Sequence, residues 1–111
     1  MTKDEFLASY NISEEDFASS GVSFETLNEI VADYRIKFQR YDDAGANLVR
    51  NLLRFKSVHS VKYRIKDPEH LIAKIVRKKI KAPKLDINTS NYSEHIHDII
   101  GIRILHLFKE D

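Results

Sequence analysis

The stretch VKYRIK at residues 61–66 alternates strictly between apolar and basic side chains. A period of two residues, with β-branched and aromatic members, predicts a β-strand. The strand therefore carries its cations on one face, each about 7 Å from the next. These cations are Lys62, Arg64 and Lys66. Their mutual repulsion is costly unless the face meets solvent or an anion, and alternation alone favours the solvent face of an edge strand.

The segment after this strand predicts a helix. Asp67 is a capping residue, Pro68 suits the first helical position, and Glu69 places an acid in the first turn. An apolar stripe follows, and the helix should end before Pro83. The stripe consists of Leu71, Ile72, Ile75 and Val76. Residues 81–92 predict a polar connection, with a further helical turn after it.

The stretch IIGIRILHLF at residues 99–108 is almost continuously apolar, which predicts a strand covered on both faces. The sequence thus offers two clear strands before it ends at Asp111. A two-stranded sheet is marginal in stability. We therefore expect either a truncated domain or a sheet edge that another copy of the chain completes.

The sequence before the first strand predicts helices. A short helix is expected over residues 4–10, and another begins at Ser13. Ser23 is the expected cap of a much longer helix over residues 24–56, in which apolar residues recur every three or four positions. This long helix is expected to be continuous or to break near Gly45.

The order of helices, strand, helix and strand predicts an α+β fold. A helical segment at residues 1–57 precedes a sheet-forming segment at residues 58–111. The first segment contains ten acidic and seven basic residues, whereas the second contains seven acidic and eleven basic residues. The second segment is therefore the expected place for a phosphate or another polyanionic ligand.

The composition excludes several classes of protein. The 111 residues are 42% hydrophobic and 32% charged, which is typical of an ordinary globular chain. No apolar run approaches the roughly 18 residues that a membrane span needs. The chain has no cysteine, so disulfides, thiolate zinc sites and a cysteine nucleophile are excluded. We expect a soluble cytoplasmic protein that does not bind membranes.

A run of cations without an intervening acid follows the apolar stripe. It consists of Lys74, Arg77, Lys78, Lys79, Lys81 and Lys84. The run suits a pocket for nucleotide phosphates or an RNA-binding surface. The alternative is a solvated helix face, and we prefer it for Lys79, Lys81 and Lys84. No aromatic residues interleave with the run, which weakens the case for single-stranded nucleic acid.

Two charged residues belong to the apolar strand or its immediate start, Asp98 just before it and Arg103 within it. Asp98 precedes it and must reach water, pair with a cation or bind a metal such as Mg²⁺. Arg103 lies between isoleucines and needs an anionic partner, so an ion pair between Asp98 and Arg103 is one alternative. The histidines are expected to face solvent, because no Cys or carboxylate cluster completes a zinc site.

These pieces together resemble the RelA/SpoT family of (p)ppGpp synthetases. That family has Arg-x-Lys on a strand, a following helix with a further Lys, and Asp-x-x-(Gly/Ala)-x-Arg at the next strand. The matching residues are Arg64, Lys66, Lys74, Asp98, Gly101 and Arg103, in the same order and spacing. The resemblance covers roughly residues 58–111.

The resemblance implies a nucleotidyltransferase-like mixed sheet and a GTP diphosphokinase of the stringent response. This enzyme would transfer pyrophosphate from ATP to the ribose 3′-hydroxyl of GDP or GTP. By carry-over, Arg64 and Lys66 hold ATP, Lys74 reaches its phosphates and Asp98 binds Mg²⁺. Arg103 contacts phosphate or supports Asp98.

Two departures from the family pattern accompany this resemblance. His70 stands where the family often has a small hydroxyl residue, and the family's guanine-stacking tyrosine and its Glu-containing motif would lie beyond Asp111. We therefore expect the N-terminal half of a small synthetase, inactive alone and self-associating through an open sheet edge. The competing hypothesis is a non-catalytic basic module that binds RNA or a partner protein.

Overall fold

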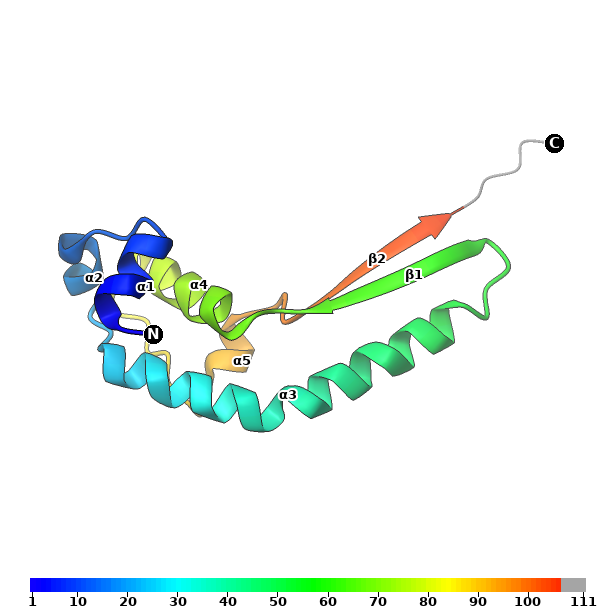
Figure 1. The fold of residues 1–111 in the computed structure, drawn as a ribbon, viewed down its shortest axis with the longest axis horizontal. Helices are drawn as coiled ribbons and strands as arrows, with labels where there is room; N and C mark the ends of the chain where they lie inside the picture. The colour runs from blue at the N-terminus through cyan, green and yellow to red at the C-terminus, as the bar shows by residue number, and fades with distance from the viewer. Residues whose placement is uncertain (107–111) are drawn as a thin grey trace.

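The computed structural model describes residues 1–106 of the chain. It is a mixed α+β structure, as the sequence predicted, with a long helix and a two-stranded antiparallel sheet (Figure 1). The elements in chain order are α1 (Lys3–Ser9), α2 (Glu14–Ser20), α3 (Phe24–Leu52), β1 (Val58–Ile65), α4 (Pro68–Lys81), α5 (Tyr92–His95) and β2 (Ile100–His106). Residues 107 and 108 of the expected second strand lie outside the described part.

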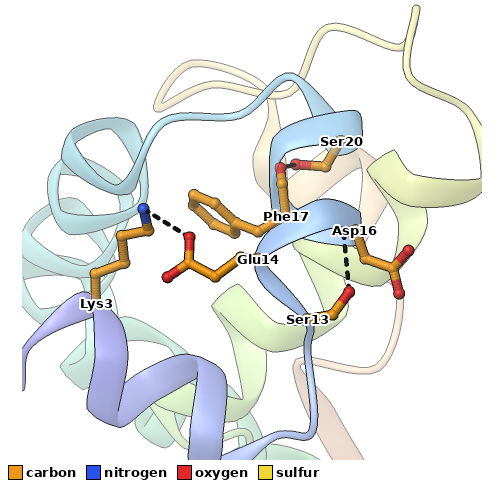
Figure 2. A network of polar contacts seen from close by, with 6 residues as sticks. All are labelled: Lys3, Ser13, Glu14, Asp16, Phe17 and Ser20. Carbon is orange, nitrogen blue, oxygen red and sulfur yellow. Dashed lines mark hydrogen bonds and ion pairs between the residues drawn. The ribbon is translucent and has the colours of Figure 1, made fainter.

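Side-chain caps mark the starts of α2, α3 and α4, as the sequence indicated. The Ser13 hydroxyl accepts a hydrogen bond from the backbone N–H of Asp16 at 3.0 Å, next to the ion pair between Lys3 and Glu14 (Figure 2). Asp67 accepts from the N–H of Glu69 at 3.0 Å and starts α4. Such caps satisfy N–H groups that have no partner within the helix.

Helix α3 is continuous, so the alternative of a break near Gly45 is wrong. Gly45 serves a different purpose, since the Tyr63 ring of β1 lies against it. A Cβ atom at position 45 would stand 2.4 Å from Tyr63 Cδ2. The Tyr63 hydroxyl also donates a hydrogen bond to Asp42 at 2.8 Å. The absent side chain at Gly45 therefore lets the strand approach the helix.

Strands β1 and β2 form an antiparallel ribbon in which Lys62 pairs with Arg103 and Arg64 pairs with Gly101. Residues opposite each other share a face of the sheet. The face that bears Tyr63 lies toward α3, so the cations occupy the other face. The predicted alternation is confirmed, although β1 begins earlier, at Val58, and ends at Ile65.

The expectation that the second strand is covered on both faces is wrong for residues 101–105, which are exposed, whereas Ile99 is buried and Ile100 is half-buried. Ile102, Ile104 and Leu105 are 36%, 37% and 52% exposed. Strand β2 has one hydrogen-bonded neighbour among the described residues, and α3 lies on one side of the ribbon only. Among the described residues, the apolar side chains of β2 are therefore more numerous than the neighbouring elements can bury.

The hydrophobic core lies at the other end of the molecule, between α1, α2, the first half of α3, α4 and α5 (Figure 1). Its fully buried side chains include Phe6, Leu27, Ile30, Tyr34, Leu71, Ile75 and Tyr92. These residues come from both segments expected from the sequence, so the two segments share one core. Within residues 1–106, no helix has the length and apolar character needed to cross a bilayer.

Candidate functional site

Asp98 lies between two lysines from different elements. Its Oδ1 is 2.7 Å from the Nζ of Lys74 on α4, and its Oδ2 is 3.2 Å from the Nζ of Lys66, which follows β1. The hydrogen bond from Lys74, joined by that from Lys66, lowers the pKa of the Asp98 carboxyl. The carboxylate is therefore ionised at neutral pH and holds two cations beside it.

The backbone fixes this arrangement. The N–H of Lys66 donates to the carbonyl of Ile99 at 2.8 Å, which joins the end of β1 to the start of β2. The hydroxyl of the buried Tyr34 on α3 donates to the carbonyl of Lys66. The peptide units around Lys66 and Asp98 are thus held by both the sheet and the core.

A groove runs past Asp98, and we call it the cationic groove. It consists of three cavities that share lining residues. The central cavity, about 310 Å³, is lined by Arg64, Lys66, Asp67, His70, Asp98 and Gly101. The α4 cavity, about 560 Å³, is lined by Lys66, His70, Lys74, Arg77, Lys78 and Lys81. The ribbon cavity, about 440 Å³, is lined by Lys62, Tyr63, Arg64, Gly101, Ile102 and Arg103.

The structure places the residues that match the family pattern along one groove, namely Arg64, Lys66, Lys74, Asp98, Gly101 and Arg103. Arg64 lies where the central and ribbon cavities meet, and Lys66 lies where the central and α4 cavities meet. Arg103 lies farther along the ribbon, across from Lys62. Among the described residues the ion-pair partners of Asp98 are the two lysines, so the alternative of an Asp98–Arg103 pair is wrong.

His70 occupies the junction of the central and α4 cavities, and Tyr10 from the N-terminal segment supports it. The two rings meet edge to face with centroids 5.4 Å apart. Arg77 donates to the Tyr10 carbonyl at 3.3 Å. Residues outside the sheet-forming segment therefore help to shape the groove. Of the other histidines, His59 and His97 are exposed, as predicted, and His95 is half-buried.

The basic run on α4 does not behave as one surface. Lys79 is 8% exposed, and its ammonium donates to the carbonyls of Pro83 and Leu85, so the prediction of a solvated side chain is wrong for this residue. Lys78 donates to the carbonyl of His95 at 2.6 Å. Lys81 and Lys84 are exposed, as predicted. The run therefore contains structural donors as well as groove residues.

Asp98 offers a single carboxylate to a cation, so the other ligands of that cation would have to come from water or from a bound substrate. Within the described chain, no group of three or more His, Asp or Glu side chains could hold a metal. Mg²⁺ is commonly held by one or two carboxylates, waters and the phosphates of a substrate. Asp98, with the ammonium groups of Lys66 and Lys74 beside it, fits that arrangement.

Tyr34 supports the site through Lys66, although its sequence pattern did not indicate this role. It belongs to the apolar stripe of α3, and its spacing predicts only a core position. A buried tyrosine usually needs a hydrogen-bond partner, which was the available signal. The identity of that partner, the carbonyl of Lys66, depends on the tertiary fold.

Comparisons of the chain with protein-family models, with curated proteins and with solved structures find no match.

Proposed function

We propose that the cationic groove binds ATP with Mg²⁺, in a nucleotidyltransferase-like sheet of the RelA/SpoT type. The observation that supports this most is the convergence of Arg64, Lys66 and Lys74 near the carboxylate of Asp98. These residues come from a strand, the residue after it, a helix and the start of the paired strand. The strand, the helix and the paired strand are separate in sequence, so it is the fold that brings their residues to one groove.

The reaction would be pyrophosphoryl transfer. The 3′-hydroxyl oxygen of GDP or GTP bonds to the β-phosphorus of ATP, the bond from that phosphorus to the α-phosphate bridging oxygen breaks, AMP leaves and the hydroxyl proton passes to solvent or a base. Such a reaction depends mainly on positioning and on neutralising phosphate charge. Mg²⁺ would supply part of that neutralisation when bound with the nucleotide.

Each groove residue has a role that its chemistry suits. The Arg64 guanidinium can contact phosphate with its donor fork or stack on adenine. Lys66 and Lys74 act as point charges for the phosphates, and Asp98 holds the cation. Arg103, on the same face of the ribbon, contacts phosphate or an extended part of the ligand. We assign no residue among 1–106 to the guanine nucleotide, so the first test measures binding.

A second candidate is a basic module for RNA or a partner protein. The observation that favours it is the exposure of Arg77, Lys81 and Lys84 beside the groove. Against it stand the engagement of Lys78 and Lys79 with backbone carbonyls and the carboxylate at the centre of the cations. RNA binding gains nothing from Asp98.

Calorimetric titration with a non-hydrolysable ATP analogue, with and without Mg²⁺, tests the proposal. We expect Arg64→Ala to weaken binding at least tenfold, because charge-assisted contacts to phosphate contribute about 1.5–3 kcal/mol each. Asp98→Ala should remove the dependence on Mg²⁺. Lys84→Ala is the matched control, since Lys84 is an exposed cation that lines none of the three cavities.

Single-stranded RNA is titrated in parallel. If RNA binds with a steep salt dependence that Lys81→Ala and Lys84→Ala reduce and Asp98→Ala leaves unchanged, the basic-module hypothesis is correct. Equal affinity of wild type and Arg64→Ala for the ATP analogue would contradict the nucleotide proposal.

We also propose that the chain self-associates through its ribbon. Each strand has one hydrogen-bonded partner within residues 1–106, and apolar side chains of β2 are exposed beside the open edge. Such edges pair readily with other strands. Light scattering coupled to gel filtration should show a mass that rises with concentration, and Ile104→Lys should reduce the rise. A strictly monomeric mass at high concentration would refute this expectation.

A further inference from the structure

Both carboxylate oxygens of Asp98 are engaged by cations. Lys74 contacts Oδ1 and Lys66 contacts Oδ2, at 2.7 and 3.2 Å. The same two lysines line the α4 cavity together with His70. The Asp98 side chain is 51% exposed, yet each of its oxygens is paired with an ammonium group in the ligand-free protein. It is nevertheless the residue best placed to hold a divalent cation.

A divalent cation that approaches Asp98 alone meets two ammonium groups. It must displace at least one of them, and the displaced lysine then remains near a cation of like charge. A cation that arrives on a polyphosphate brings the anion that both lysines need. The lysines can then leave the carboxylate and pair with phosphate oxygens, while the cation pairs with the carboxylate. Every charged group keeps a partner of opposite charge.

The two lysines differ in their freedom to make this exchange. The Lys74 side chain is 44% exposed, whereas that of Lys66 is 18% exposed. The backbone of Lys66 is held on both sides by Tyr34 and Ile99. Lys74 is therefore the partner that moves, while Lys66 stays close to the carboxylate.

We propose that Asp98 accepts a divalent cation only together with a polyphosphate, because Lys74 blocks the carboxylate until phosphate draws it away. This inference rests on the proposed function and extends it, since it states that the ligand is the metal–nucleotide complex and not either component. Coupling between two ligands is reciprocal, so the cation must strengthen polyphosphate binding by the factor with which polyphosphate strengthens cation binding.

The test measures Mn²⁺ bound to the full chain by electron paramagnetic resonance, without any phosphate. Lys74→Met keeps much of the side-chain volume and removes the charge. We expect it to tighten Mn²⁺ binding roughly three- to tenfold, consistent with the modest strength of exposed ion pairs and the double charge of the cation. Lys84→Met is the matched control, because Lys84 is an exposed cation that lines none of the three cavities, and it should change Mn²⁺ binding little.

For Mn²⁺ bound to a polyphosphate, we expect Lys74→Met to change the affinity in the opposite direction. The complex of Mn²⁺ with a non-hydrolysable ATP analogue, and separately with tripolyphosphate, should bind at least tenfold more weakly to Lys74→Met than to wild type. A variant that merely damages the fold would weaken both Mn²⁺ and its complexes. The gain for Mn²⁺ alone must also vanish in Asp98→Asn/Lys74→Met, which locates it at Asp98.

The two proposals can fail separately. Wild type that binds Mn²⁺ alone as tightly as Lys74→Met overturns the blocking role of Lys74, whatever nucleotides do. If Lys74→Met shows the gain for Mn²⁺ and the loss for Mn²⁺–tripolyphosphate, the inference is supported. If in that case the ATP analogue binds no variant, including wild type, the assignment to ATP is wrong and the site takes another polyphosphate.

Discussion

Truncation of Tyr34 to alanine is expected to lower the free energy of unfolding by about 3–5 kcal/mol, the usual range for a fully buried aromatic side chain. Tyr34 has no exposed surface and packs against Phe38, Tyr41 and Tyr92, with ring centroids 5.7–6.4 Å away. Its hydroxyl holds the carbonyl of Lys66. Chemical denaturation followed by circular dichroism measures the change.

Tyr34→Phe separates the ring from the hydroxyl. It keeps the aromatic packing and removes one hydrogen bond, so a loss of about 1–3 kcal/mol is expected because the Lys66 carbonyl is left without its donor. The same variant should weaken binding of the ATP analogue, since the peptide unit that carries Lys66 becomes less restrained. A Tyr34→Phe protein as destabilised as Tyr34→Ala would contradict the role given to the ring.

Alkaline pH provides an independent check on Tyr34. Burial, together with Tyr41 and Asp67, raises the pKa of its hydroxyl to about 12 from an ordinary value of 10.0. A raised pKa in the folded state contributes stability that is fully present below the unfolded value and is lost as the pH rises from 10 through 12. Tyr34→Phe should therefore lose less stability than wild type across this interval.

Lys79→Met is expected to lower the free energy of unfolding by about 2–4 kcal/mol, because hydrogen bonds from charged donors contribute more than neutral ones and two carbonyls lose their donor. The Lys79 ammonium donates to the carbonyls of Pro83 and Leu85 and so ties the chain after α4 back onto that helix. It also lies in the last turn of α4, where a cation complements the helix dipole. Chemical denaturation again provides the measurement.

Lys81→Met serves as the control for Lys79→Met. Lys81 lies in the same turn of α4 but is exposed, so its replacement should change stability by no more than about 0.5 kcal/mol. Hydrogen exchange should show faster amide exchange in the segment after Ala82 in Lys79→Met and not in the control. Equal stabilities of the two variants would mean that Lys79 is as dispensable as a surface lysine.

The local elements could be predicted from the sequence because their signals lie within a few residues. The alternation at residues 61–66 predicted the strand, and Asp67-Pro68-Glu69 predicted the start of α4. The expectation that the apolar stretch is covered on both faces failed at residues 101–105. Periodicity describes what a strand could bury and not what is available to cover it. The sequence left open whether the long helix breaks near Gly45, whereas in the structure the helix is continuous and this residue accommodates a ring from a strand distant in sequence.

For the candidate site too, some features could be predicted from the sequence and others depend on the tertiary structure. The types and order of Arg64, Lys66, Lys74, Asp98 and Arg103 are visible in the sequence, and so is the shared face of the strand cations. The sequence left open whether Asp98 pairs with Arg103, with other cations or with a metal. The structure pairs it with Lys66 and Lys74, because the end of β1, α4 and the start of β2 meet beside Tyr34.

The sequence by itself determined which residues form strands and helices and which face of the ribbon is basic, because both depend on spacings of two to four residues. Only the tertiary structure decided what each cation does. Lys79 ties a loop to its helix, Lys74 covers a carboxylate and Lys81 faces solvent, although all three belong to one basic run. The role of a lysine depends on the oxygen atoms that the fold places around it, and those atoms belong to residues that local patterns do not connect to it.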